Sequence, residues 1–553
     1  MGNQSMSNKR LMFACWSLSS TKLVLLVLVI PLIVVSGLFA FLGPKPPNYP
    51  WLWSSVSSSS SSNSFNTTSV SSISRRDINN IEGSLKSNMV VDVNSNKEEA
   101  ISDDSLLNRS SSPPLAIQVI SSSPSLENSN GTKENSFNIS ASELQIGVPL
   151  LVNESHVPLV KARRRRREYT HLERLEARLM KARFAISEAK VGNQTQDPEY
   201  VPIGPMYWNS KAFHRSYLEM EKEFKVFVYK EGEPPLFHNG PCKSIYSMEG
   251  NFIHEIEKNS QFRTKDPNKA HVYFLPFSVT MLVRYVYVRD SHDFHPIKQT
   301  VVDYINVVSE KYPFWNRSLA ADHFMLSCHD WGPETSRSHQ FLHKNSIRVL
   351  CNANTSEGFN PSRDASFPEI NLLSGATDGL LGGPSASRRP NLAFFAGGVH
   401  GPIRPILLKH WENKDEAMKI QQYLPKGVSY YDMLRKSKFC ICPSGYEVAS
   451  PRIVEAIYTG CVPVLISDHY VPPFSDVLNW KSFSVEVPVK DIPNLKRILM
   501  SISSRQYIRM QRRVLKVRRH FEINSPPKRF DVFHMILHSV WLRRLNIRIS
   551  DDH

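Results

Sequence analysis

The hydrophobic pattern of the 553-residue chain begins with one long apolar run, from Leu23 to Leu42. Twenty helical residues rise about 30 Å, which matches the hydrocarbon core of a bilayer. Basic residues are denser before this run than after it: Lys9, Arg10 and Lys22 against Lys45. The positive-inside tendency therefore predicts a cytosolic tail (1–22), a transmembrane signal-anchor (23–42) and a luminal remainder. Because bulky residues close the run, we expect an uncleaved anchor instead of a cleaved signal peptide.

A long polar segment separates this run from the rest of the chain. Residues 43–165 are rich in Ser and Asn, with a six-serine run at Ser57–Ser62, and poor in aromatic residues. Such a composition buries too little apolar surface to offset its ordering entropy, so we expect a disordered luminal stem. A block of arginines, Arg163–Arg167, closes it. We interpret the block as a solvated charge run, with a proprotein cleavage site or a contact with acidic glycan as alternatives.

Beyond the stem, helix and strand patterns alternate. Apolar residues at helical spacing mark the segments 166–195 and 511–553. Between them lie short apolar runs that we expect to be buried parallel strands: Phe224–Tyr229, Val272–Phe277, His323–Ser327, Ile347–Cys351, Leu392–Ala396, Phe439–Cys442 and Val462–Ile466. The Gly- and Pro-containing stretch Gly382–Pro390 is typical of a linker. We therefore predict an α/β fold with two Rossmann-like lobes, 196–385 and 386–510, and a cleft between them. One large sheet is the alternative.

The charge and the cysteine content indicate the cellular compartment of the protein more clearly than its function. The formal net charge is +16, and the arginine block supplies almost a third of it, so basicity is a weak guide to an anionic partner of the folded part. Six of the seven cysteines follow the anchor, which suits two or three disulfides of undetermined pairing in an oxidising compartment. Asn-x-Ser/Thr triplets beyond the anchor agree with a luminal position: Asn66, Asn108, Asn130, Asn138, Asn153, Asn193, Asn316 and Asn354.

The segment 450–466 carries the clearest chemical signal. We predict that Ser450 caps a short helix, that Pro451 takes its first position, and that a glycine ends it before a buried strand. Arg452 and Glu455 share one face of this helix at i, i+3 spacing. A guanidinium at a helix N-terminus with a carboxylate one turn on suits a nucleotide sugar, because the cation meets the diphosphate and the carboxylate meets ribose hydroxyls. The alternative is a semi-buried Arg–Glu pair that braces two elements.

The sequence lacks the usual metal-binding motif of enzymes that hold a diphosphate through a metal ion. No Asp-x-Asp triplet occurs, so a metal-clamped diphosphate lacks its usual ligand pair, and we expect no metal and no other cofactor. Arginines and glycine turns at helix N-termini are then the expected binding groups: Gly397, Arg404, Ser444, Gly445 and Arg452. A plain tight turn explains the Gly397-Gly398 pair equally well.

Six segments, in order between residues 220 and 500, resemble those of the exostosin family, glycosyltransferase family 47: Lys225–Tyr229, Asp266–Phe277, Asp322–Phe324 with Cys328–Gly332, Arg389–Gly397, Cys442–Gly445 and Ser450–Ile466. The resemblance implies a type II Golgi membrane protein of GT-B fold, with an acceptor lobe (196–385), a nucleotide-sugar lobe (386–510) and closing helices (511–553). It also implies inverting transfer of a hexosyl, pentosyl or glycuronosyl group from a nucleotide sugar, which we expect to be a UDP-sugar. Ala320 stands where the family usually has Gly, and Arg363 where it usually has Lys.

An inverting transfer needs a general base near the acceptor hydroxyl. The ionisable candidates of the N-terminal lobe are Glu249, Asp322, His323, His329 and Asp330. We place Asp322 and His323 first, because they stand at the mouth of a predicted strand. A structural role, such as capping a loop or bonding a neighbour, is the alternative for each of them.

Three functions compete at this point. The first is a Golgi glycosyltransferase whose partners are a nucleotide sugar, a cell-wall polysaccharide or other glycan acceptor, the Golgi membrane and other glycosyltransferases, with no nucleic acid. The second is a catalytically silent glycan-binding or scaffold subunit, against which the presence of Arg452 and Glu455 argues. A glycoside hydrolase ranks last, because no paired carboxylate motif stands out.

Overall fold

The computed structural model describes residues 170–550, all within one compact unit. The predicted cytosolic tail, signal-anchor and stem lie outside these residues. Within the described range, no helix combines the length and hydrophobicity that crossing a membrane requires.

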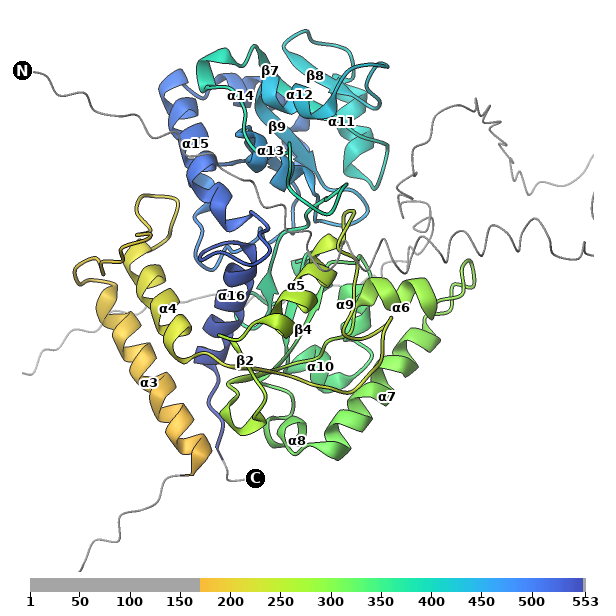
Figure 1. Cartoon of the computed structure of the whole chain (residues 1–553). Coiled ribbons are helices and arrows are strands. Elements are labelled where there is room, and N and C mark those ends of the chain that lie inside the picture. The colour runs from red at the N-terminus through yellow and green to blue at the C-terminus, as the bar shows by residue number, and fades with distance from the viewer. Residues whose placement is uncertain (1–169, 551–553) are drawn as a thin grey trace, which may run out of the picture. The chain divides into compact units, whose positions relative to one another are not determined.

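Two separate parallel sheets organise the described residues (Figure 1). The first sheet has the strand order β2-β1-β3-β4-β5-β6, and every strand pair in it is parallel. Its strands are β1 (Val226–Val228), β2 (Arg263–Thr264), β3 (Val272–Phe274), β4 (His323–Ser327), β5 (Ile347–Leu350) and β6 (Ala365–Ser366). The inner strands are buried at each residue, as expected for a parallel sheet covered on both faces.

The second sheet is built in the same way. Its order is β11-β10-β9-β7-β8, again with parallel pairing throughout. Its strands are β7 (Asn391–Ala396), β8 (Met418–Gln421), β9 (Ser437–Pro443), β10 (Val462–Ile466) and β11 (Val485–Glu486). Two parallel sheets in succession confirm the prediction of a two-lobed, GT-B-like α/β fold. All seven predicted strands are present, and four further strands were not predicted: β2, β6, β8 and β11.

The helices accompany the sheets in chain order. Those of the N-terminal lobe are α3 (His171–Ala189), α4 (Ser210–Glu223), α5 (Ser247–Lys258), α6 (Val279–Tyr285), α7 (His295–Lys311), α8 (Phe314–Ser318), α9 (Gly332–Ser336) and α10 (Gln340–Lys344). Those of the C-terminal lobe are α11 (Ile403–Trp411), α12 (Tyr430–Lys436), α13 (Arg452–Thr459), α14 (Leu495–Met500) and α15 (Ser504–Val517). Helix α3 starts with a capping box, in which Thr170 accepts from the N–H of Glu173 and Glu173 accepts from that of Thr170.

The last helix returns to the first sheet. Helix α16 (Val532–Asn546) packs against α4, β5 and β6, although α15, which precedes it, belongs to the C-terminal lobe (Figure 1). Nearly all its residues are buried, which explains why its apolar residues do not form a single stripe. One core cluster contains side chains of both sheets, so the lobes share a continuous hydrophobic core.

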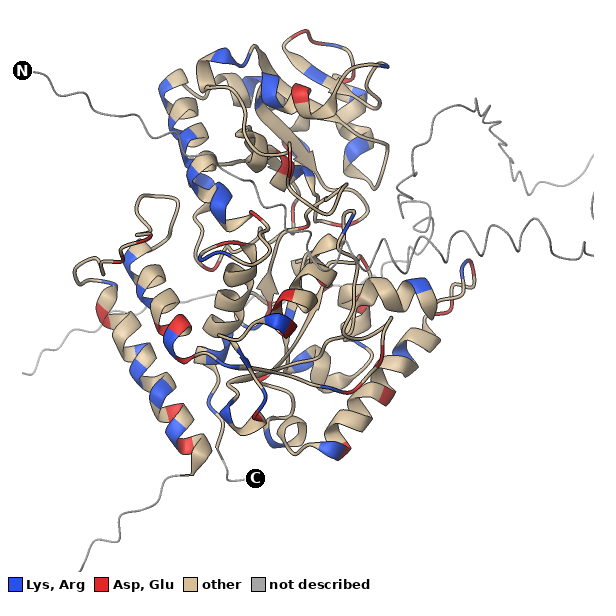
Figure 2. Ribbon diagram, viewed as in Figure 1, with Lys and Arg blue, Asp and Glu red and all other residues tan. Residues whose placement is uncertain are grey.

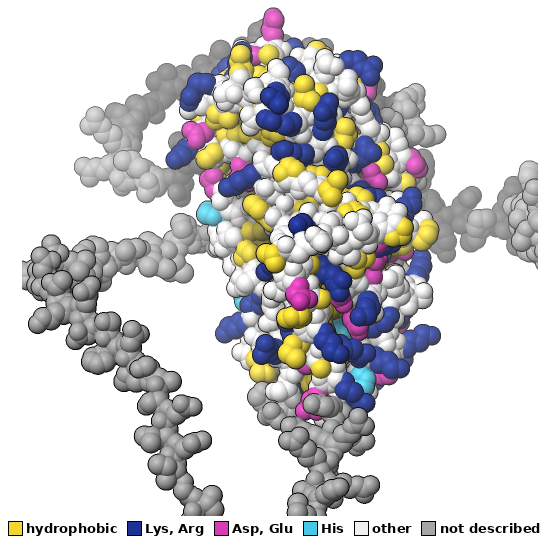
Figure 3. Space-filling model, turned by 90° about the vertical axis from the view of Figure 1, so that its left-hand side faces the viewer, with side chains coloured by type: hydrophobic (Ala, Val, Ile, Leu, Met, Phe, Trp, Pro, Cys, Tyr) yellow, Lys and Arg dark blue, Asp and Glu magenta, His cyan; other side chains and the backbone are white. Residues whose placement is uncertain are grey.

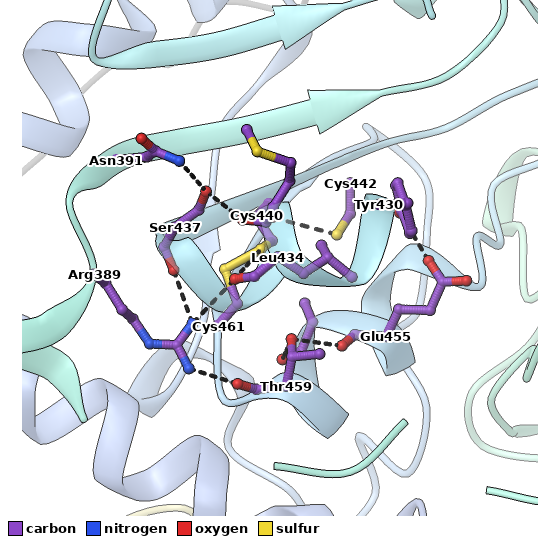
Figure 4. Close-up of a disulfide and its surroundings, with 12 residues drawn as sticks. Arg389, Asn391, Tyr430, Leu434, Ser437, Cys440, Cys442, Glu455, Thr459 and Cys461 are labelled. Atoms are coloured by element: carbon purple, nitrogen blue, oxygen red, sulfur yellow. Dashed lines mark hydrogen bonds between the residues drawn. A yellow bond between two sulfur atoms is a disulfide. The ribbon is translucent and has the colours of Figure 1, made fainter. Parts of the chain in front are cut away.

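Two disulfides tie strands to the segments beside them. Cys328 bonds Cys351, and Cys440 bonds Cys461 (Figure 4), which agrees with the expected two or three bridges. Arg389 lies next to the second bridge, 1% exposed, and donates to the carbonyls of Leu434, Ser437 and Thr459. Because two of these carbonyls lie near the ends of α12 and α13, the cation stabilises both helix C-termini. The predicted linker Gly382–Pro390 is thus anchored in the C-terminal lobe.

The turn before β4 explains one departure from the family pattern. Leu319 and Ala320 have φ angles of 48° and 68°, in the left-handed region that favours glycine. Ala320 is nevertheless fully buried within the aromatic core beneath the first sheet. The methyl group of Ala320 therefore packs in the core, whereas a glycine at this position would adopt the left-handed backbone conformation more easily. Arg363, the second departure, bonds the carboxylate of its neighbour Asp364.

Candidate active site

A pocket of about 460 Å³ lies where loops from the carboxyl ends of both sheets meet. The N-terminal lobe lines it with Ile245, Tyr246, Asp330, Glu369, Asn371 and Leu373. The C-terminal lobe contributes residues from the loops after β7 and β9 and from helices α11, α12 and α13, among them Gly398, His400, Arg404, Tyr430, Gly445, Glu447, Arg452 and Glu455. Most groups predicted to bind a nucleotide sugar thus converge on a single cavity.

Helix α13 brings Arg452 to this pocket. The helix begins at Arg452, with Pro451 at its N-cap and Gly460 (φ 70°) after its end, so it starts one residue later than predicted. Ala396, the last residue of β7, accepts from Nη2 of Arg452 at 3.2 Å through its carbonyl. Among residues 170–550, no carboxylate lies within ion-pair distance of this guanidinium. Arg452 and Glu455 therefore form no direct salt bridge, although their charges attract each other across the shared helix face.

Gly397 is placed behind Arg452. It does not line the pocket, but a Cβ atom at this position would lie 2.3 Å from Nη2 of Arg452. Real Cβ contacts are essentially never this short, so a larger residue at position 397 would make the guanidinium of Arg452 shift. Gly397 thus leaves room for the present position of this guanidinium at the end of β7.

Glu455 occupies the same helix face one turn later. Its side chain is buried, and its Oε2 accepts a hydrogen bond of 2.8 Å from the hydroxyl of Tyr430 (Figure 4). Burial raises the pKa of Glu455, while Arg452 and the bond from Tyr430 act in the opposite direction. Asn371 and Tyr431 also donate to this carboxylate, so three neutral donors orient it.

Arg404 and Gly445 form a second contact between loops. Arg404 is buried on α11 and donates to the carbonyl of Gly398 at 3.4 Å. A Cβ at Gly445 would lie 3.0 Å from Nη2 of Arg404. Ser444 does not line the pocket; its hydroxyl donates to the carbonyl of Val448 and shapes the loop. Two arginines and two glycine-containing turns therefore surround one part of the pocket, as an anionic diphosphate requires.

Carboxylates also line the pocket. Asp330, Glu369 and Glu447 line it, and Oε2 of Glu447 is buried without a hydrogen-bond partner. Burial, together with the charges of Asp330, Glu357 and Glu369, raises the pKa of Glu447 to about 9. Among the described residues, no three His, Cys, Asp or Glu side chains are arranged to hold a metal ion. Glu369 and Glu447 were not predicted from the sequence, whereas Asp330 was one of the five candidates for the base.

Asp322 and His323, the leading candidates for the base, lie elsewhere. They stand at the amino end of β4, whereas the pocket lies at the carboxyl ends of the strands, and neither lines it. The Asp322 carboxylate accepts from Nδ1 of His323 at 2.9 Å and from Arg317 at 3.1 Å. Although burial opposes ionisation, His323 and Arg317 lower the pKa of Asp322 to about 2. Because Asp322 and His323 are buried and lie outside the pocket, we correct their assignment as the general base.

Glu249 and His329 support the loop that carries Asp330. The buried carboxylate of Glu249 accepts from the N–H groups of Cys328 and His329, at 2.9 and 3.0 Å. Burial lowers the pKa of His329 to about 3, and its neutral Nδ1 accepts from the N–H of Trp331. Both residues are therefore structural, and of the five original candidates only Asp330 reaches the pocket.

Three of the predicted glycosylation sites fall within the described residues. Asn193 and Asn316 are exposed, whereas Asn354 is 8% exposed. Nδ2 of Asn354 donates to Glu357, and its Oδ1 caps the turn that follows. The amide of Asn354 is therefore less accessible than those of Asn193 and Asn316. The other five triplets lie outside the described range.

Comparison with known proteins agrees with this geometry. The model of the exostosin GT47 domain matches residues 220–502. The chain belongs to this glycosyltransferase family. A probable glycosyltransferase of Arabidopsis thaliana is 70% identical over 388 residues, covering 70% of this chain and 75% of that protein. A second from the same plant is 58% identical over 381 residues, covering 68% of this chain and 79% of its own length.

More distant relatives carry names that specify a sugar. The probable beta-1,4-xylosyltransferase IRX10 of Arabidopsis thaliana is 27% identical over 356 residues, covering 58% of this chain and 82% of its own. Among solved structures, Acinetobacter baumannii MurG matches with a TM-score of 0.25 at 10% identity, covering 52% of this chain and 94% of that chain. That structural similarity is too low to bear on the fold.

Proposed function

We propose that this family member is an inverting glycosyltransferase that moves a sugar from a nucleotide-sugar donor to a cell-wall polysaccharide or another glycan. The observation that carries the proposal is the position of Arg452, whose guanidinium lines the pocket without a carboxylate partner among the described residues. A half-buried arginine that forms no salt bridge is well suited to bind an anionic ligand. The diphosphate of the donor is an anion of the right class.

The pocket suggests how the donor would lie. Arg452, Arg404 and the glycine turns around Gly398 and Gly445 would hold the diphosphate through charge and close backbone approach. Glu455, oriented by Tyr430, would accept hydrogen bonds from the ribose hydroxyls. A UDP-sugar fits this arrangement, and its reactive sugar would then face the other carboxylates that line the pocket.

Glu447 is our candidate for the general base. In the transfer, the acceptor oxygen forms a bond to the anomeric carbon, the bond from that carbon to the diphosphate breaks, and the acceptor proton passes to the base. The buried, unpartnered Oε2 of Glu447 is available for this proton, and its raised pKa makes it a strong base once ionised. The transfer rate should consequently rise with pH towards 9. Asp330 is the discriminating alternative, since it also lines the pocket.

The names of relatives bear on the class of sugar that is transferred. One relative is named a xylosyltransferase, and a protein from rice, 27% identical over 348 residues, is named a glucuronosyltransferase. These names favour transfer of a pentosyl, hexosyl or glycuronosyl group. The two disulfides support a luminal location, because such bonds persist in oxidising compartments. We therefore also propose a single-pass Golgi membrane protein with residues after 42 in the lumen.

A donor screen tests the proposal. The full chain in detergent is incubated with a panel of UDP-sugars, and nucleotide release is measured with and without wall oligosaccharides. We expect release with one donor to rise when its acceptor is present, and the stereochemistry of the product to show inversion. The Glu447→Gln variant should bind nucleotide normally and transfer little sugar. The Asp330→Asn variant should transfer sugar faster than Glu447→Gln does. Absence of transfer by the wild type with every donor, despite nucleotide binding, would instead favour the silent subunit.

A further inference from the structure

Helix α15 presents a row of cations that the pocket does not use. Arg505, Arg509, Arg512 and Lys516 are all exposed and follow one another at intervals of four, three and four residues. This spacing places them on one face of the helix, here called the α15 stripe. The opposite face is in the core, through Tyr507, Met510, Val514 and Val517.

The α15 stripe lacks compensating charges. Helix α15 contains no Asp or Glu, and among the described residues none of its four cations forms an ion pair or a side-chain hydrogen bond. The adjoining 3₁₀ turn η5 (Ala386–Arg388), which packs on α15, adds the exposed Arg388. Figure 2 shows the basic residues following one another along α15, and Figure 3 shows basic side chains gathered over this side of the C-terminal lobe.

Repulsion makes this arrangement unfavourable in the free protein. Like charges one helical turn apart repel each other and destabilise a helix. An ordinary solvated helix face intersperses acids among its bases, as α3 does with Glu173, Glu176 and Glu188. A polyanion with regularly spaced charges would remove the repulsion along the whole stripe.

The stripe is separate from the pocket. Helix α15 packs against the C-terminal end of α13, where Leu515 and Gln511 lie next to Gly460. The pocket lies at the other end of α13, at Arg452. A ligand on α15 would therefore leave the donor groups free.

We propose that the α15 stripe binds a linear acidic polysaccharide whose uronate carboxylates repeat along the chain. The four cations extend over about 16 Å, since eleven residues rise about 1.5 Å each. An extended polyanion can engage such a straight row at each turn. A membrane surface fits less well, because the apolar face of α15 is buried in the core and cannot insert into lipid. Given the proposed function, a glycan held on α15 raises the local concentration of acceptor chains near the pocket.

A pair of charge-matched variants tests the proposal on the full chain in detergent. One carries Gln at the four stripe positions, written Arg505→Gln, Arg509→Gln, Arg512→Gln and Lys516→Gln. The control carries Gln at four exposed cations of the N-terminal lobe, written Arg174→Gln, Lys181→Gln, Lys230→Gln and Lys265→Gln. Both lose four positive charges. Binding of polygalacturonate oligomers is measured at low and high salt, with neutral xylan oligomers and phosphatidylserine vesicles as comparison probes.

We expect the wild type to bind polygalacturonate but not xylan, with an affinity that falls as salt rises. The stripe variant should lose about tenfold or more of this affinity, and the control about twofold or less. Equal losses in both variants, or binding of vesicles in preference to polygalacturonate, would overturn the proposal. Thermal unfolding verifies that the stripe variant is folded. Nucleotide binding in the pocket should be unchanged, so failure here is distinguishable from failure of the proposed function.

Discussion

The hydroxyl of Tyr430 lies 2.8 Å from Oε2 of Glu455, and both residues line the pocket between the lobes. Burial raises the pKa of Tyr430 well above its ordinary value, so the phenol remains a hydrogen-bond donor at every physiological pH. It fixes one oxygen of the carboxylate and thereby directs the other acceptor positions. Glu455 is the acidic residue of α13, and Tyr430 orients its carboxylate towards the pocket.

Substitution of Glu455 should weaken nucleotide binding more than stability. Glu455→Gln keeps the size of the side chain but replaces one acceptor oxygen with an amide group. Since a hydrogen bond to a charged group contributes about 1.5–3 kcal/mol, nucleotide affinity should fall roughly 10- to 100-fold. Nucleotide titration and thermal unfolding on the same samples check this. Unchanged affinity together with a lower melting temperature would assign Glu455 to structure alone.

Gly397 and Arg452 should behave as one unit. Gly397→Ala puts a methyl group where Nη2 of Arg452 lies, and Arg452→Lys replaces the planar fork with a point charge. Each change alone should lower nucleotide affinity about tenfold or more, because each displaces the guanidinium. The double variant should be little worse than either single variant, which a double-mutant cycle measures. Additive losses would show that Gly397 acts through the backbone and not through Arg452.

The bridge between Cys440 and Cys461 should stabilise the C-terminal lobe. It closes a loop with a sequence separation of 21 residues, for which loop-closure entropy predicts about 3 kcal/mol. The paired substitution Cys440→Ala with Cys461→Ala should lower the denaturant midpoint accordingly. Cys442→Ala, at a buried free cysteine of the same strand, is the control for lost packing. A paired variant no less stable than this control would contradict the expectation.

The inner strands were predictable because each contains a run of apolar residues, whereas the strands at the sheet edges lack one. All four strands that the sequence analysis missed, β2, β6, β8 and β11, are edge strands. Three have two residues each, and β8 alternates buried with half-exposed positions. Such segments lack the continuous apolar run by which a central parallel strand is recognised.

The sequence predicted some of the residues that line the pocket and missed others, and the difference lies in how far apart they are along the chain. Arg452 and Glu455 share one short helix, so local spacing brought them together. Tyr430 and Glu447 reach the pocket from α12 and from a loop, and only tertiary packing places them there. Asp322 was misplaced because a strand has two ends and its pattern does not reveal which one faces the cleft. In a parallel α/β sheet the carboxyl end does, and Asp322 stands at the other.

Chelation should leave the transfer largely intact. The prediction comes from the absent Asp-x-Asp triplet and from two arginines in the pocket that suit a diphosphate. Transfer is measured in excess EDTA and again after manganese is added. Retention of most activity in EDTA is expected; loss of most activity, restored by manganese, would favour a metal-clamped donor.

Glu447 should make stability fall as pH rises. The pKa of its carboxyl is about 9 in the folded protein, against an ordinary value of 4.5. Between these two values the folded state binds one proton more than the unfolded state, so the free energy of unfolding decreases with increasing pH. The slope is at most about 1.4 kcal/mol per pH unit, and water near the half-buried side chain reduces it.

Glu447→Gln removes this titration, so the variant should match the wild type near pH 4 and become progressively more stable than it towards pH 9. Urea unfolding of both proteins across this range measures the difference. Parallel pH profiles would mean that the carboxyl ionises normally. Its assignment as a strong general base would then lose its electrostatic support, and Asp330 would take its place as the leading candidate.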